Sequence, residues 1–176
     1  MDYPGKTERL QLRRLTLDDA DLMLAVWNDP AFIRFVGDRG IRTLEEAQQA
    51  MLDGPLMLYE KYGYGPYRVA LKDDDTEIGI CGIFRRDGLD EPDIGFSTLP
   101  EFCGRGYAYE AACAVVEFAR TRLRIPVLTA IVSPDNAASV GLIRKLGLSF
   151  ERMYLWPDSD EEVAIYSMQL IDAEGV

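Results

Sequence analysis

The sequence predicts a mixed α/β (α+β) fold of about seven strands and about four helices, forming one domain over residues 1–176. Two patterns carry this prediction. In some stretches polar and apolar residues alternate, as in a half-buried strand, and in others apolar residues recur three and four positions apart, as on one face of a helix. The chain is in the usual size range of one domain and has no repeat, low-complexity tract or linker that would divide it.

The expected elements follow one another along the chain with short connections. Strands are predicted at residues 7–15, 67–71, 77–84, 93–99, 127–132, 148–155 and 163–170, and helices at 17–28, 43–52, 107–122 and 136–146. Two helices begin at a capping-box pattern, in which a threonine is followed three residues later by an acid: Thr16 with Asp19, and Thr43 with Glu46. The Gly- and Tyr-rich stretch 59–67 is interpreted as a loop.

Composition and charge exclude several classes of function. The formal net charge of −11 argues against a nucleic-acid partner, because phosphates attract basic surfaces. It suits a cationic acceptor such as an amine, or it only keeps the protein in solution. No apolar run is long enough to span a membrane, and Met1–Gly5 lacks the basic and apolar regions of a signal peptide. We therefore expect a cytoplasmic protein that does not associate with membranes.

The residue types that are missing narrow the chemistry further. The chain has no histidine, which excludes imidazole bases, histidine triads and two-histidine metal sites. Its three cysteines, Cys81, Cys103 and Cys113, are odd in number and have no C-x-x-C spacing. Neither a disulfide framework nor a metal site is expected, and proton transfer must use carboxylate, hydroxyl, thiol, amine or water.

A glycine loop opens the helix predicted at 107–122. In Cys103–Ala108 the loop follows a strand directly, so the first backbone N–H groups of the helix are left unpaired and the helix dipole is positive there. Gly104 and Gly106 allow the backbone to come close to a diphosphate, and Arg105 adds charge. The third glycine of a dinucleotide-binding loop and the Gly-Lys-Ser/Thr of a P-loop are both absent. The alternative is a simple tight turn.

Residues 93–112 resemble the acetyl-CoA signature of the GNAT N-acetyltransferases, in which a strand leads to Q/R-x-x-G-x-G/A and a helix. Gly106 and Ala108 match the last two motif positions, whereas Cys103 stands where the family has Gln or Arg. The resemblance implies a mostly antiparallel central sheet that splays between the fourth and fifth strands.

Two further segments are similar to the RimJ/RimL-like branch of that family. Asn136–Ser139 with residues 142–148 resembles its N-x-x-S…LEKLGF segment, and residues 7–15 with Trp27–Pro30 resemble its opening strand and helix. The resemblance extends over about residues 7–170.

The resemblance implies direct transfer of an acetyl group from acetyl-CoA to a primary amine, either a protein N-terminus or a small amine, without a covalent acyl-enzyme. It also implies a set of cofactor-binding residues: Phe96, Ser97 and Thr98 through their backbone, Cys103, Gly104, Arg105, Gly106, Tyr107 and Ala108 around the diphosphate, and Asn136 and Ser139 near the pantetheine arm and thioester. Asn136 is alternatively a helix cap. The rival interpretation is a non-catalytic CoA-binding or interaction module, and a different acyl donor such as succinyl- or propionyl-CoA is a further alternative.

Candidate catalytic residues follow from the same resemblance. The position that carries the acid tyrosine in many relatives is Ile143, so Ser139 is the candidate proton donor, unless it only bonds to its own helix N-terminus. Asp93 is the first candidate base and Glu91 the second; either is alternatively a solvated loop acid. Trp27, Phe32 and Tyr64 are expected to form an acceptor pocket, with Trp27 alternatively a core residue. A monomer or a homodimer is expected.

Overall fold

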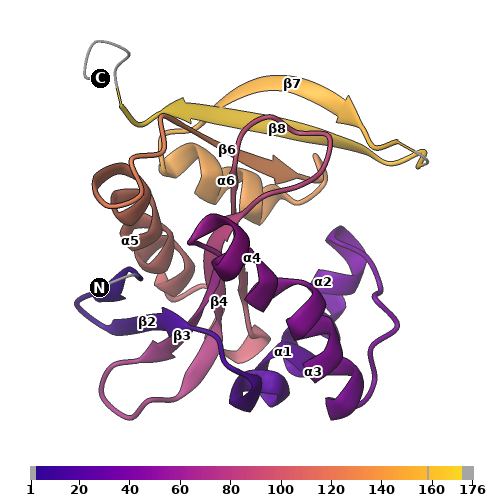
Figure 1. Ribbon diagram of the computed structural model, residues 1–176. Helices are drawn as coiled ribbons and strands as arrows, with labels where there is room; N and C mark the ends of the chain where they lie inside the picture. Colours follow the sequence, from indigo (N-terminus) through magenta and orange to yellow (C-terminus); the bar gives the residue numbers. More distant parts are fainter. Residues whose placement is uncertain (1–2, 158, 172–176) are drawn as a thin grey trace.

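A computed structural model of the chain describes residues 3–157 and 159–171. Its strands form one eight-stranded sheet in the order β1-β2-β3-β4-β5-β6-β8-β7 (Figure 1). The strands are β1 (Gly5–Lys6), β2 (Leu10–Arg14), β3 (Pro66–Leu71), β4 (Glu77–Phe84), β5 (Asp93–Thr98), β6 (Val127–Val132), β7 (Ser149–Leu155) and β8 (Glu162–Gln169). The α-helices are α1 (Ala20–Trp27), α2 (Pro30–Phe35), α3 (Leu44–Asp53), α4 (Pro55–Tyr62), α5 (Tyr107–Thr121) and α6 (Ala137–Lys145), with short 3₁₀ turns at η1 (Leu17–Asp19) and η2 (Pro100–Phe102).

The sheet is antiparallel except between β5 and β6. These two strands are parallel and are in register at a single position, Asp93 opposite Thr129. The contact is held by Thr129, whose backbone N–H and hydroxyl both donate to the carbonyl of Pro92, at 2.9 and 3.0 Å. Beyond this point the strands separate, which confirms the predicted splay between the fourth and fifth strands and opens a gap in the sheet.

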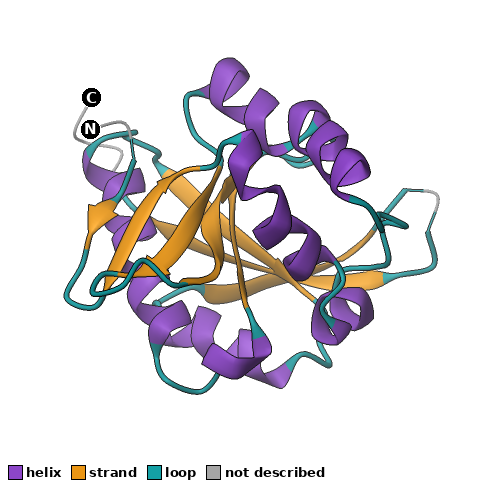
Figure 2. Ribbon diagram, turned by 90° about the horizontal axis from the view of Figure 1, so that it is seen from below, coloured by secondary structure: helices purple, strands orange, loops and turns teal. Residues whose placement is uncertain are grey.

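Helices cover both faces of the sheet (Figure 2). Helices α1 to α4 pack against one another as one group, whereas α5 lies against β2, β4 and β5. The buried face of α5 is made largely of small residues, which lets the helix lie close to the strands: Ala111, Ala112, Val115, Val116 and Ala119. None of the helices within the described ranges has the length and apolar character needed to cross a membrane.

Two helices, α2 and α4, were not predicted, and the interpretation of residues 59–67 as a loop is wrong for residues 59–62. Both helices begin with a proline, a residue that disfavours the interior of a helix but is favourable at its first position. Gly63 ends α4 in the left-handed conformation, with φ +77°. Tyr59 is buried because its hydroxyl donates to the carbonyl of Pro66 and accepts from the N–H of Leu15. The two-residue strand β1 was also not predicted.

Candidate active site and cofactor cleft

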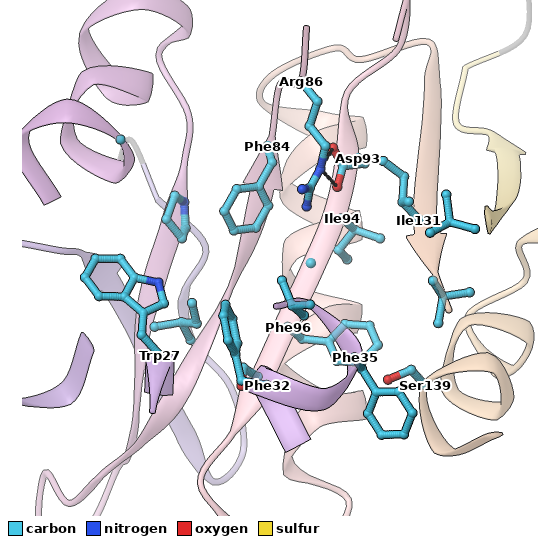
Figure 3. Close-up of a pocket in the computed structure, with 18 of the residues that line it drawn as sticks. Trp27, Phe32, Phe35, Phe84, Arg86, Asp93, Ile94, Phe96, Ile131 and Ser139 are labelled. Carbon is cyan, nitrogen blue, oxygen red and sulfur yellow. Dashed lines mark hydrogen bonds and ion pairs between the residues drawn. The ribbon is translucent and has the colours of Figure 1, made fainter. Parts of the chain in front are cut away.

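A cleft of about 420 Å³ lies where β5 and β6 separate (Figure 3). Its walls come from β4, β5 and β6, from the helices α1, α2, α4 and α6, and from the β7–β8 hairpin. The site therefore lies where two neighbouring strands of the described sheet pair at a single position.

The loop before α5 is shaped to receive an anion. Gly104 and Gly106 have φ +74° and +80°, a conformation that residues with a side chain rarely adopt. Gly106 is the N-cap of α5, and the backbone N–H groups from Gly104 to Tyr109 find no acceptor within the described part of the chain. Free N–H donors at the positive end of a helix dipole fit a diphosphate.

Arg9 holds this loop in place, although its sequence position gave no indication of it. Its Nε lies 2.6 Å from a carboxylate oxygen of Glu110 in α5, and a terminal nitrogen donates to the carbonyl of Arg105 at 3.0 Å. The guanidinium also lies 4.6 Å above the ring of Tyr107. Cys103, at the first motif position, places its Sγ 3.5 Å from the carbonyl oxygen of Thr98, so it closes the turn after β5.

The edge of β5 that faces the cleft has no strand partner beyond Asp93, while its other edge pairs with β4 along its whole length. Phe96 and Ser97 line the cleft, and Thr98 lies just outside the lining at the end that leads to the glycine loop. A free strand edge offers backbone N–H and C=O groups in a row, which suits the amide groups of a pantetheine arm.

The N-terminus of α6 brings Asn136 and Ser139 to the cleft. The Oδ1 atom of Asn136 accepts the N–H of Ser139 at 3.2 Å, so the capping role considered for Asn136 is present. Its side-chain amide has no acceptor within the described residues and remains available for a ligand. The Ser139 hydroxyl likewise makes no hydrogen bond there and is directed toward the cleft (Figure 3), while Ile143 is buried beneath it.

Asp93 lies at the point where the two strands separate, and its side chain is only 2% exposed. The Nε atom of Arg86, in the loop after β4, lies 3.1 Å from each of its carboxylate oxygens (Figure 3). Burial raises the pKa of Asp93, and the positive charge of Arg86 opposes that rise. A buried carboxylate with a raised pKa, reached from the cleft, is chemically suited to accept a proton.

Two of the three residues predicted for the acceptor pocket lie in the cleft lining. Trp27 and Phe32 line the cleft, joined by Phe35, Phe84 and Trp156. Gly95 makes room for this aromatic wall, because a Cβ there would lie 2.7 Å from the Phe84 ring.

Tyr64, which was expected in the acceptor pocket, and Glu91, the second candidate base, do not line the cleft. Tyr64 stacks instead on Tyr62, with ring centroids 5.8 Å apart, because the turn at Gly63 folds the chain back on α4. Glu91 lies two residues before β5 and is half-buried outside the lining. No cysteine lines the cleft either, so the cleft offers no thiol nucleophile.

Comparison with known proteins places this geometry in a family. Residues 9–149 match the family described as Acetyltransferase (GNAT) domain. The chain is 27% identical over 175 residues to an uncharacterized N-acetyltransferase, p20, of Bacillus licheniformis, and the alignment covers 96% of each chain. An acetyltransferase of Agrobacterium tumefaciens str. C58 has a similar structure, with a TM-score of 0.78 at 28% identity, over 93% of this chain and 92% of that one.

RimL, a ribosomal L7/L12 alpha-N-protein acetyltransferase solved in complex with coenzyme A, shares the fold, with a TM-score of 0.80 at 16% identity over 95% of this chain and 97% of that one. The family match includes the glycine loop, the free edge of β5 and the start of α6. The chain therefore belongs to the GNAT family of acetyltransferases and is an enzyme that uses acetyl-CoA.

Proposed function

We propose that the protein transfers the acetyl group of acetyl-CoA directly to a primary amine, with Asp93 as the base. The observation that carries this proposal is the buried Asp93 carboxylate in the lining of a cleft along the free edge of β5, the strand that leads toward the glycine loop. A donor held at the loop and an acceptor amine at Asp93 would meet along the free edge of β5.

The cofactor-binding part of the proposal uses donors that have no acceptor within the described residues, together with Arg9, which is paired with Glu110. The N–H groups from Gly104 to Tyr109 would hold the diphosphate, with Arg9 adding positive charge beside them. The pantetheine arm would run along β5 past Phe96 to Thr98, with the Asn136 side-chain amide on its other side. Acetyl-CoA supplies the activated thioester that the amine attacks.

The chain's own residues then move protons. The amine nitrogen gives up a proton to Asp93, directly or through one water, as its bond to the acetyl carbon forms. A backbone N–H of β5 stabilises the charge that develops on the carbonyl oxygen. When the carbon–sulfur bond breaks, the thiolate takes a proton from the Ser139 hydroxyl or from water. No acyl-enzyme forms, which agrees with a cleft that holds neither cysteine nor histidine.

The acceptor class has two candidates. The RimJ/RimL-like segments support a protein N-terminus, as in the RimL enzyme whose fold is shared. A small amine is the second candidate, supported by a cleft of only about 420 Å³. Both react by the same chemistry at Asp93.

Thiol release from acetyl-CoA, measured with a panel of primary amines, tests the proposal. Asp93→Asn should lower kcat/KM by about 10²- to 10⁴-fold and remove the acidic limb of its pH profile, with little change in CoA affinity. That limb should lie above the ordinary aspartate pKa of 3.8, because the pKa of Asp93 is raised, and activity should fall as pH decreases through it. Glu91→Gln is the matched control and should retain activity.

Two outcomes would contradict the proposal in different ways. An Asp93→Asn enzyme as active as its parent would mean that the base lies elsewhere. CoA binding without thiol release for any amine would favour the non-catalytic CoA-binding module.

A further inference from the structure

Arginines gather at the acceptor end of the cleft of a protein whose net charge is −11. Arg39 reaches the cleft from the connection between α2 and α3, and Arg85 and Arg86 reach it from the loop after β4. The lining has two carboxylates, Asp93 and Glu161. Asp93 is paired with Arg86, and Glu161 is exposed on the β7–β8 hairpin and pairs with none of the three arginines. The local charge is therefore opposite in sign to the net charge.

The guanidinium groups of Arg86 and Arg39 have N–H donors that find no acceptor among the described residues. Arg86 uses only its Nε on Asp93, and its two terminal nitrogens have no acceptor within the described part of the chain. Arg39 forms no hydrogen bond or ion pair with any described residue; its guanidinium lies 5.5 Å above the ring of Trp27 and 6.0 Å above that of Phe32. A guanidinium fork with free N–H groups is suited to bind a carboxylate through two hydrogen bonds.

Arg39 and Arg86 are close enough to affect one another. The pKa of Arg39 is lowered, first by burial of its guanidinium and second by the positive charge of Arg86. The residue as a whole is exposed, while its guanidinium lies over the rings of Trp27 and Phe32. Two like charges that face one cleft would both be relieved by an anion between them.

We infer, on the basis of the acetyl transfer proposed above, that the acceptor is an α-amino acid with an apolar or aromatic side chain, whose carboxylate is bound by Arg86 and Arg39. Arg86 and Asp93 are in contact, so a cationic and an anionic group lie side by side in the site. An α-amino acid carries its amine and carboxylate on one carbon, which matches that spacing. Trp27, Phe32 and Phe84 then provide an apolar wall for the side chain.

The arrangement also favours the reaction. The carboxylate of a free amino acid stabilises its own ammonium form, and pairing the carboxylate with two arginines removes that stabilisation. The amine therefore loses its proton to Asp93 more readily. A peptide N-terminus has no free α-carboxylate, and a polyamine would bring a second positive charge toward Arg39 and Arg86.

Three acceptors that differ at one position test the inference: L-phenylalanine, L-phenylalanine amide and phenethylamine. Thiol release from acetyl-CoA should show kcat/KM at least about tenfold higher for the amino acid than for either compound without a carboxylate. Calorimetric titration of L-phenylalanine into the CoA-bound protein should detect binding that the amide lacks.

Arg39→Gln tests the assignment of the carboxylate site, since Arg39 does not contact Asp93. It should raise KM for L-phenylalanine about tenfold and change KM for the amide and the amine much less, because they lack the carboxylate. Arg34→Gln is the matched control: Arg34 also lies over an aromatic ring, that of Phe35, but outside the cleft lining, and the variant should behave as the parent.

Two results would overturn the inference. Equal kcat/KM for the three acceptors would remove the carboxylate from recognition while leaving the proposed acetyl transfer intact. An Arg39→Gln variant that affects the amide as much as the acid would show that Arg39 only supports Trp27 and Phe32. No release with any amine would instead contradict the proposed function itself.

Discussion

The loop before α5 can be tested by adding one methyl group at Gly106. Its backbone, with φ +80° and ψ +3°, lies in the left-handed region, which costs an L-residue about 1–2 kcal/mol. Gly63 has nearly the same backbone, with φ +77° and ψ −1°, but it ends α4 and is not part of the loop before α5. Gly106→Ala and Gly63→Ala should therefore lose similar stability, about 2–8 °C in melting temperature for a chain of this size.

The two variants should differ in their affinity for CoA. A residue strained at Gly106 relaxes by rotating the peptide groups whose N–H donors face the anion, and its Cβ would lie 3.5 Å from a terminal nitrogen of Arg9. One hydrogen bond to a charged phosphate contributes about 1.5–3 kcal/mol, so Gly106→Ala should raise the Kd of CoA about 10- to 150-fold. Gly63→Ala should leave that Kd unchanged.

Calorimetric titration with CoA and thermal unfolding without it measure the two effects separately. The assignment of the diphosphate to this loop would be refuted by a Gly106→Ala protein that melts as early as Gly63→Ala and yet binds CoA as tightly as the parent. If both variants lost affinity, the loss would reflect general destabilisation, and the loop would again have no specific role.

Substitutions at three further positions, Asn136, Ser139 and Asp19, test structural and chemical roles. Asn136→Ala removes both the cap and the free amide, whereas Asn136→Asp keeps the cap. Both variants should lose about 1 kcal/mol of CoA affinity, but only the alanine variant should have a lower melting temperature. Unchanged CoA affinity in both would mean that Asn136 is a cap alone. Ser139→Ala should lower kcat toward the low end of about 10²- to 10⁴-fold, with little change in acetyl-CoA affinity; an unchanged kcat would mean that water supplies the proton. Burial works to raise the pKa of Asp19, but hydrogen bonds from Arg13 and Thr16 outweigh it and hold this pKa below 3.8. The ionised Asp19 therefore stabilises the fold above about pH 4, and this contribution is lost as pH falls through the lowered pKa. Asp19→Asn should lower the free energy of unfolding in urea by about 1–3 kcal/mol at pH 7. Between pH 4 and 2 the variant should lose less stability than the parent.

Much of the fold could be predicted from the sequence because its signals are local. Alternation and helical spacing identified seven strands of the sheet and the helices α1, α3, α5 and α6 to within a few residues. The helices α2 and α4 were missed because a proline such as Pro30 or Pro55 can follow the end of one helix or occupy the first position of the next helix. Composition alone does not tell these two cases apart.

The site residues also fall into those that are contiguous in the sequence and those that only the fold brings together. Gly104 and Gly106 could be identified in the sequence because the loop and its helix are contiguous, and the structure keeps them together. Arg9 and Arg86 could not, because their roles depend on Glu110 and Asp93, which the sheet brings to them from other elements. Glu91 is the opposite case. It is close to Asp93 in sequence, but it lies outside the cleft lining because it precedes β5, which begins at Asp93.

The net charge of the molecule is compatible with an amine acceptor but does not distinguish one amine from another. A net charge of −11 is a sum over the whole surface, and at physiological ionic strength an exposed charge acts over only about 8 Å. Within the cleft the decisive charges are those that line it, and Arg39, Arg85 and Arg86 are in the majority there. On the amino-acid recognition inferred above, the acidic exterior and the basic recess act at different stages: the exterior influences which amines approach, and the recess discriminates among them by the group next to the amine. Because chemistry requires a bound and deprotonated amine, the recess would then determine which substrate reacts.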